Sequence, residues 1–132
     1  MNFEEFKANQ LLVLPPNPDV DFSGKTIIIT GANAGIGYEL TRYYLKQNAK
    51  QIVMVCRSIE KAEKAKQKLL SEMNRKDDGV IRIELMNMLS FNSVKACADK
   101  LNATLESVHV IHHNAGMACV PKQLSEDGYE TV

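Results

Sequence analysis

Four short runs rich in apolar residues predict four strands along the chain. They are residues 25–30 (KTIIIT), 51–56 (QIVMVC), 80–86 (VIRIELM) and 108–113 (VHVIHH). The first run is β-branched and does not alternate between apolar and polar positions, which is typical of a strand buried on both faces of a parallel sheet. We therefore expect a parallel sheet that is covered by helices.

Between these runs, apolar residues recur three and four positions apart, which predicts a helix after each of the first three strands. Ser58 is expected to cap the second helix, and Ser90 or Ser93 the third. Ser125 precedes two acids and predicts the start of a further helix. The apolar positions of the three helices are Ile36, Leu40 and Tyr43 or Tyr44; Ala62, Ala65, Leu69 and Met73; and Val94, Cys97, Ala98 and Leu101.

This alternation of strands and helices predicts the fold class. Residues 24–132 are expected to form an α/β unit, a Rossmann-type doubly wound parallel sheet truncated after about four strands, in the order 3-2-1-4. Right-handed crossovers then place the first two helices on one face and the third on the other. Residues 1–23 are expected to form an arm, in which Phe3 and Phe6 fit a short helix and three prolines between positions 15 and 18 exclude a long one.

Composition narrows the class of protein. The 132 residues are enough for one domain, and 16 Lys+Arg against 16 Asp+Glu argue against a dedicated nucleic-acid binder. No apolar run reaches the ~20 residues of a membrane helix or the ~7 of a signal sequence. The three cysteines, Cys56, Cys97 and Cys119, include no C-x-x-C pair. They are expected to be reduced thiols of a cytoplasmic protein.

The strongest chemical signal is the glycine-rich segment TGANAGIG, from Thr30 to Gly37, between the first strand and the first helix. Gly31 would permit a tight turn, Gly35 would let the backbone approach a pyrophosphate, and Gly37 would let the helix pack close to the strand. Free N–H groups at the helix start then bind phosphates. The alternative is a loop that merely needs flexibility, but the strand–turn–helix context favours a nucleotide site.

Three motifs together resemble the short-chain dehydrogenase/reductase family. They are TGANAGIG, the strand end Cys56-Arg57, and Asn114-Ala115-Gly116 after the fourth strand, and the resemblance covers residues 22–132. The stretch from Arg57 to Lys64 and the segment 126–130 are more narrowly similar to retinol-dehydrogenase-like and fungal carbonyl-reductase members. The resemblance implies hydride transfer between a nicotinamide and a carbonyl or alcohol carbon.

The cofactor is expected to be NADP(H) rather than NAD(H). Arg57 stands twenty residues after Gly37, where an acid would select NAD, and its planar guanidinium suits a 2′-phosphate, with the Ser58 hydroxyl beside it. A solvated surface arginine is the alternative. The expected cofactor-binding residues are Thr30, Gly31, Asn33, Gly35, Ile36, Gly37, Arg57, Ser58, Asn87, Asn114, Ala115 and Gly116.

Two positions depart from the family pattern. Asn87 stands where members usually carry an adenine-contacting Asp, and His113 stands where a second Asn commonly precedes Asn114. Asn114 could contact the nicotinamide ribose or only bridge strand ends. His109, His112 and His113 raise the question of a metal, but successive residues of a strand face opposite ways and no acid or cysteine has ligand spacing, so no metal site is expected.

The family's catalytic residues are not found. The resemblance implies a Ser and a Tyr-x-x-x-Lys pair, but the residues four positions after Tyr38, Tyr43 and Tyr44 are Arg, Gln and Asn. No catalytic residue is therefore assigned, and we expect the cofactor-binding part of a reductase, inactive alone. It could be a truncated product, a shortened isoform or an incomplete gene model.

Two other classes of protein compete with this interpretation. One is a non-catalytic dinucleotide-binding sensor or partner module. The other is an unrelated Rossmann-like nucleotide binder such as a methyltransferase, which Arg57 disfavours because it replaces the acid that would bond a ribose diol. In the full order 3-2-1-4-5-6 the fourth strand is interior, but in a sheet truncated after four strands it would form an edge that is apolar at Val108, Val110 and Ile111. We therefore expect a marginal monomer that self-associates there.

Overall fold

The computed structural model describes residues 2–10, 16, 18–117 and 123–131 of the chain. It contains a four-stranded, all-parallel sheet in the order β3-β2-β1-β4, so the predicted α/β fold and strand order are confirmed. Pro15 and Cys119 lie outside the described residues. The elements are α1 (Phe3–Gln10), β1 (Thr26–Thr30), α2 (Gly35–Lys46), β2 (Gln51–Cys56), α3 (Ile59–Glu72), β3 (Ile81–Leu85), α4 (Phe91–Thr104) and β4 (Val110–His112).

The sheet is built around β1 and β2. All five residues of β1 are buried, as the non-alternating sequence TIIIT predicts. Strand β4 is shorter than the predicted 108–113 and pairs with β1 from Ile27↔Val110 to Ile29↔His112. Its three residues are half-buried or exposed. Strand β4 is therefore an edge strand of the described sheet, and the apolar run in the sequence extends beyond the residues that form its hydrogen-bonded ladder.

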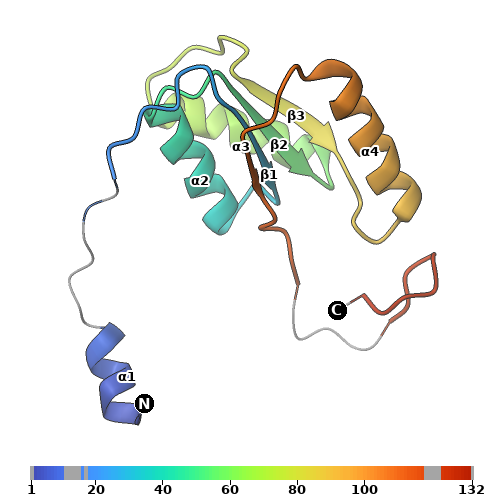
Figure 1. The fold of residues 1–132 in the computed structure, drawn as a ribbon, viewed down its shortest axis with the longest axis horizontal. Coiled ribbons are helices and arrows are strands. Elements are labelled where there is room, and N and C mark those ends of the chain that lie inside the picture. Colours follow the sequence, from blue (N-terminus) through green and yellow to red (C-terminus); the bar gives the residue numbers. More distant parts are fainter. Residues whose placement is uncertain (1, 11–15, 17, 118–122, 132) are drawn as a thin grey trace.

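Helices cover both faces of the sheet (Figure 1). On one face, α2 and α3 pack on Ile27, Ile29 and Met54. On the other, α4 packs through Cys97 on Ile28 and Val53. This is the distribution that right-handed crossovers predict for the strand order.

Serine side chains fix the starts of two helices. The Ser58 Oγ accepts a hydrogen bond from the Lys61 N–H (3.4 Å) at the start of α3. The Ser90 Oγ accepts from the Ser93 N–H (3.3 Å) at the start of α4. Ser90, not Ser93, is therefore the cap of α4, and the Ser93 hydroxyl instead accepts a bond from the Asn87 N–H (2.9 Å).

The last residues of the arm, between Pro18 and Phe22, contact the unit that contains the sheet. Helix α1 stands apart from the sheet in Figure 1, with Phe3 and Phe6 exposed. Further along the arm, the Tyr43 hydroxyl donates a hydrogen bond to the Pro18 carbonyl (3.0 Å). The Phe22 ring lies edge-on to the Tyr44 ring, with centroids 4.8 Å apart. Aromatic contacts with α2 therefore hold the end of the arm.

The predicted helix at Ser125 is wrong for this structure. Residues 125–129 form a turn closed by an antiparallel bridge between Leu124 and Glu130. Gly128 has φ +81°, in the left-handed region, which interrupts any helix that Ser125 would start. The Asp127 carboxylate accepts the Phe91 N–H (2.8 Å), so the turn is tied to the first residue of α4.

Candidate functional site

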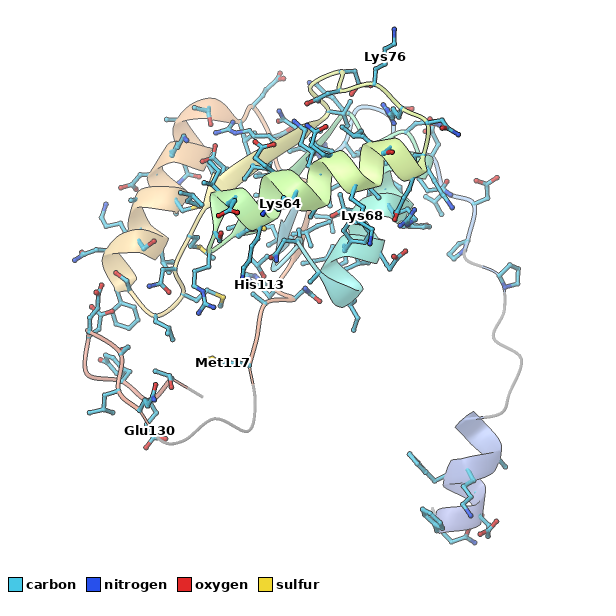
Figure 2. The ribbon with its side chains drawn as sticks, turned by 180° about the vertical axis from the view of Figure 1, so that it is seen from behind. Lys64, Lys68, Lys76, His113, Met117 and Glu130 are labelled. Carbon is cyan, nitrogen blue, oxygen red and sulfur yellow. The ribbon has the colours of Figure 1, made fainter. Side chains whose placement is uncertain are left out.

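The glycine-rich turn lies at the carboxyl end of β1. The chain leaves β4 at the same end, through His113 toward Met117, on the opposite side of the molecule from Lys76 (Figure 2). In open α/β sheets, ligands bind at this edge where neighbouring crossovers go to opposite faces. Here that point lies between β1 and β4, because β1 leads to α2 on one face and α4 on the other face leads to β4.

The backbone of the turn requires glycine at two positions. Gly31 has φ +66° and its N–H donates to the Val55 carbonyl (2.8 Å), which ties the turn to β2. Gly35 has φ +53°, and no atom lies near the place where its Cβ would be. Ala34 is the residue before α2, and no side chain of this residue caps the N–H groups of the first turn. Such an uncapped start can accept an anion.

A third glycine allows α2 to approach β1. A Cβ on Gly37 would collide with the Gly31 carbonyl oxygen and lie 2.7 Å from the Asn114 Nδ2. A Cβ on Gly31 would lie 3.1 Å from the Ala115 Cα. The glycine-rich turn and the segment after β4 therefore pack in direct contact, which only residues without a side chain permit.

The Thr30 hydroxyl joins the ends of β1 and β4. It accepts the Asn114 and Ala115 N–H groups (both 3.0 Å) and donates to the His112 carbonyl (3.2 Å). The Asn114 side chain also donates to the Thr30 carbonyl (3.0 Å). Asn114 therefore bridges the ends of β1 and β4, which is the structural role that the sequence analysis allowed for it.

The remaining residues of the turn are more open. Ile36 is 74 % exposed, Asn33 is half-buried and Gly116 is exposed. Beneath the turn lies the buried Cys56 thiol, a support that the sequence analysis did not assign. Burial raises its pKa, although the N–H groups of Ala32 and Asn33 act in the opposite direction. Cys56 is therefore a neutral packing group, not a reactive thiolate.

Arg57 and Ser58 follow β2 at the same edge of the sheet. Arg57 is exposed and makes no hydrogen bond or ion pair with any residue that the structure describes. Its five N–H donors are therefore available to an anion. The Ser58 hydroxyl already caps α3 and can still donate its proton.

Asn87 occupies the corresponding place after β3. Its side chain is half-buried, and its Oδ1 accepts the Leu89 N–H (3.2 Å) in a local turn. The side-chain amide can still donate to a ligand. Direct contacts thus join the glycine-rich turn, at Thr30, Gly31 and Gly37, to the segment Asn114–Ala115. The other expected residues, Arg57, Ser58 and Asn87, lie along the same edge of the sheet without such contacts to the turn.

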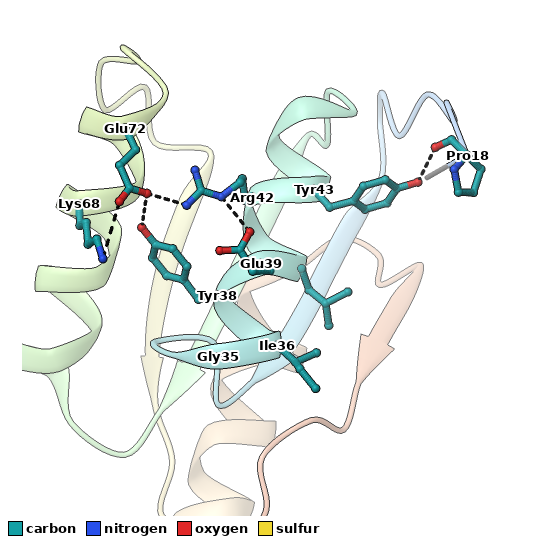
Figure 3. A pocket seen from close by; sticks show the side chains of 10 residues that line it. Pro18, Gly35, Ile36, Tyr38, Glu39, Arg42, Tyr43, Lys68 and Glu72 are labelled. Carbon is teal, nitrogen blue, oxygen red and sulfur yellow. Dashed lines mark hydrogen bonds and ion pairs between the residues drawn. The ribbon is translucent and has the colours of Figure 1, made fainter. Parts of the chain in front are cut away.

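A groove of about 970 Å³ lies elsewhere, over the outer surface of α2 and α3 (Figure 3). Only Gly35 and Ile36 belong both to this groove and to the expected cofactor site. Its other lining residues are Pro18, Tyr38, Glu39, Leu40, Arg42, Tyr43, Lys68 and Glu72. The sequence analysis predicted no groove at this place.

Glu72 organises the polar side of the groove. Its carboxylate accepts hydrogen bonds from Arg42 (2.6 Å) and from the Tyr38 hydroxyl (2.9 Å). The Arg42 hydrogen bond, followed by that of Tyr38, lowers the pKa of Glu72. Burial, followed by contact with Glu72, raises the pKa of Tyr38. The three groups therefore form a network of ionic and hydrogen-bonded contacts between α2 and α3.

Among the residues that the structure describes, no cluster of three or more His, Cys, Asp or Glu side chains could hold a metal ion. No helix there is long and apolar enough to cross a membrane.

Comparisons with known proteins identify the family of this chain. The sequence matches the short chain dehydrogenase family over residues 25–132. It is 32 % identical over 127 residues to the short chain dehydrogenase/reductase dmxR8 of Cryptosporiopsis sp., covering 96 % of this chain and 39 % of that protein. It is 35 % identical over 112 residues to the WW domain-containing oxidoreductase of Danio rerio, covering 85 % and 26 %.

Solved structures share the fold. A protein from Mycobacterium paratuberculosis superimposes with a TM-score of 0.68 at 28 % identity, over 84 % of this chain and 37 % of that one. L-sorbose reductase from Gluconobacter frateurii, complexed with NADPH and L-sorbose, superimposes with a TM-score of 0.63 at 20 % identity. The superposition covers 85 % of this chain and 40 % of that one.

The fold defines a Rossmann-like nucleotide-binding protein. The family match identifies the chain as a member of the short-chain dehydrogenase/reductase family. The chain spans about a third of the length of the curated relatives it matches.

Proposed function

We propose that this chain is the NADP(H)-binding part of a short-chain dehydrogenase/reductase. The observation that carries the proposal is the contact between the glycine-rich turn and the Asn114–Ala115 segment at the edge between β1 and β4. A ligand that spans this edge would meet the uncapped start of α2 and the exposed Arg57 on the same side of the sheet.

Each group of residues has a proposed role toward the dinucleotide. Backbone N–H groups of the turn would bind the pyrophosphate. Arg57 and Ser58 would bind the 2′-phosphate, and Asn87 the adenine. The segment after β4 would adjoin the nicotinamide ribose. The complete set is Thr30, Gly31, Asn33, Gly35, Ile36, Gly37, Arg57, Ser58, Asn87, Asn114, Ala115 and Gly116, within a unit of residues 24–132 that follows an arm of residues 1–23.

The proposed reaction class is hydride transfer. Bound NADP(H) supplies or accepts the hydride, and a positioned acid must move a proton on the substrate. Since the 132-residue sequence contains no Tyr-x-x-x-Lys pair, we propose that this chain binds the dinucleotide without turning over a carbonyl substrate alone. The same absence keeps a non-catalytic sensor or partner module as the second candidate. Turnover of a carbonyl with NADPH by the isolated chain would contradict this assignment.

Two further properties belong to the proposal. We place the protein in the cytoplasm, because Cys56 and Cys97 are free thiols.

We also propose self-association through β4, which is hydrogen-bonded to β1 alone among the described strands. Val108 and Ile111 are 42 % and 50 % exposed at this edge.

Fluorescence titration with NADPH and NADH tests the cofactor assignment. A charge-assisted contact with the 2′-phosphate contributes about 1.5–3 kcal/mol, so NADPH should bind about 10- to 100-fold more tightly than NADH. Arg57→Gln should remove most of this preference. Lys76→Gln, which removes a charge at the far side of the molecule, should leave it intact. Equal affinity of the unmodified chain for both dinucleotides would contradict the assignment of Arg57.

A further inference from the structure

The segment that leaves β4 contacts the α/β unit again at the start of α4. Residues 123–131, which we call the strap, form a turn closed by an antiparallel bridge. In Figure 1 the strap, drawn in red, lies beside the first turn of α4. The Asp127 Oδ2 accepts the Phe91 N–H at 2.8 Å. The rings of Phe91 and Tyr129 lie with their centroids 5.2 Å apart. A hydrogen bond and a ring contact therefore attach the strap to the first residue of α4.

Backbone hydrogen bonds order the strap itself. The Ser125 N–H donates to the Tyr129 carbonyl at 2.7 Å, and the Thr131 N–H donates to the Gln123 carbonyl at 3.1 Å. These bonds join the backbone on the two sides of Asp127. The Asp127 carboxylate is therefore held by a folded turn rather than by an extended chain.

The first turn of α4 also holds Asn87, the residue expected to contact the adenine. The Asn87 N–H donates to the Ser93 Oγ at 2.9 Å, and the Ser90 N–H donates to the Asn87 carbonyl at 3.1 Å. Phe91 lies between Ser90 and Ser93 in the sequence, so the strap and the Asn87 loop are bound to the same helical turn. The position of Asn87 therefore depends on the order of this turn.

Asp127 supplies a contact that the start of α4 lacks without it. The first N–H groups of a helix have no acceptor within the helix. The Ser90 Oγ accepts the Ser93 N–H, and Asp127 accepts the Phe91 N–H, so the two side chains satisfy different groups. A carboxylate is also favoured at a helix N-terminus by the helix dipole. Loss of Asp127 would therefore loosen the first turn of α4.

The strap leaves the groups expected to face the ligand open. Arg57 has no partner among the described residues, and the Asn87 side chain uses its Oδ1 in a local turn, which leaves the amide N–H groups available. The same segment begins at Asn114 and Ala115, whose N–H groups bind Thr30 beside the glycine-rich turn. One stretch of chain therefore contacts elements at both ends of the proposed dinucleotide site.

We propose that Asp127 is a positioning residue for the adenine end of this site: by attaching the strap to Phe91, it orders the first turn of α4 and the Asn87 loop and so raises the affinity for the dinucleotide. The inference rests on the proposed function, which assigns the adenine to Asn87. The coupling is reciprocal, so a ligand bound at Asn87 also strengthens the attachment of the strap.

The test compares two variants that carry the same charge. Asp127→Ala removes the acceptor of the Phe91 N–H, whereas Asp127→Asn keeps a side-chain oxygen that can accept it. Glu126→Ala removes the neighbouring exposed carboxylate of the strap and is the control for charge. Calorimetry at neutral pH measures the binding of NADP⁺ and of adenosine 2′,5′-bisphosphate, which carries the adenine and the 2′-phosphate but no nicotinamide.

A hydrogen bond contributes about two- to tenfold to an equilibrium, so Asp127→Ala should bind both ligands about two- to tenfold more weakly than Asp127→Asn. Both ligands should be affected alike, because both carry the adenine end. Asp127→Asn and Glu126→Ala should bind as the unmodified chain does. Equal affinities of the Ala and Asn variants, tighter binding by Asp127→Ala, or a loss confined to NADP⁺ would each overturn the inference.

Amide hydrogen exchange at Phe91 measures the coupling from the other side. In the absence of ligand, this amide should exchange faster in Asp127→Ala than in Asp127→Asn, and saturating NADP⁺ should slow its exchange in the unmodified chain. Bound NADP⁺ that leaves this exchange unchanged would refute the coupling. If the unmodified chain binds neither ligand, the proposed function fails and this inference fails with it. If it binds both and the two Asp127 variants agree, only the role of the strap is refuted.

Discussion

Gly37 shows how a single hydrogen atom in place of a side chain determines the approach of α2 to β1. We predict that Gly37→Ala destabilises the chain by about 1–3 kcal/mol, because the new methyl group would collide with the Gly31 carbonyl. Urea unfolding followed by circular dichroism measures the change. Gly116→Ala is the control, since its Cβ would meet nothing within 4 Å, and it should cost under about 0.5 kcal/mol. Equal costs for the two variants would contradict this account.

Thr30 makes three hydrogen bonds with one hydroxyl, so its replacement affects several groups at once. Thr30→Val keeps the shape of the side chain but leaves the Asn114 and Ala115 N–H groups without their acceptor. We predict a loss of about 2–3 kcal/mol in the free energy of unfolding. Thr41→Val is the matched control, because the Thr41 hydroxyl bonds only the Gly37 carbonyl in its own helix, and it should be nearly neutral. A Thr30→Val variant as stable as this control would refute the role of the hydroxyl.

At the level of single residues, sequence analysis identified the glycine-rich turn but not its supports. The spacing of Gly31, Gly35 and Gly37 is visible in the sequence because a strand and a helix flank it. The contact of Gly37 with Asn114 is not visible, since the two residues are 77 positions apart. The contact between Tyr44 and His112 could not be predicted for the same reason, since these two residues are also far apart in the sequence.

Strand β3 carries a buried charge at the other edge of the sheet. The Glu84 carboxylate is 5 % exposed and pairs with Arg82 (2.6 Å) and Lys100 (2.8 Å). Burial by itself raises the pKa of Glu84, but the hydrogen bonds from Lys100 and Arg82 outweigh it, and the net pKa is lowered below its ordinary 4.5. This stabilisation is therefore present above about pH 4.5 and is lost as the pH falls through the lowered value.

We predict that Glu84→Gln reduces stability at neutral pH by about 1.5–3 kcal/mol and flattens the loss of stability below about pH 4.5. Unfolding midpoints measured in urea across this pH range give both quantities. Glu63→Gln removes a carboxylate from the exposed face of α3 and is the control. If both variants keep the acid sensitivity of the unmodified chain, the Glu84 network does not contribute as described.

Periodicity predicted the elements well where neighbouring layers bury them. Strands β1 and β2 begin and end within a residue of the expected ranges, because both faces of each are covered. Strand β4 is shorter because it has one neighbour, so its apolar residues extend beyond its hydrogen bonds. The helix predicted at Ser125 is absent because the left-handed Gly128 and a bridge between Leu124 and Glu130 satisfy the backbone locally.

On the scale of the whole molecule, β4 is an edge strand among the strands that the structure describes, and the proposed self-association would occur there. We predict that light scattering after gel filtration gives a mass above that of a 14.7 kDa monomer, rising with protein concentration. Ile111→Lys should lower this mass, because it places a charge on an edge residue that is 50 % exposed. Ile59→Lys makes the same change at a 54 % exposed position on α3 and should not lower it. A concentration-independent monomer would contradict the prediction.

The Thr30 contacts also have a consequence for the order of folding. The hydrogen bonds that join β1 to the segment after β4 connect residues 82 to 85 positions apart. The chain between them contains two strands and three helices, and the entropy of closing so long a loop opposes these contacts until that intervening structure has formed. We therefore expect the proposed dinucleotide site to assemble in one of the last steps of folding, so that a ligand bound there would stabilise the folded state without accelerating the earlier steps.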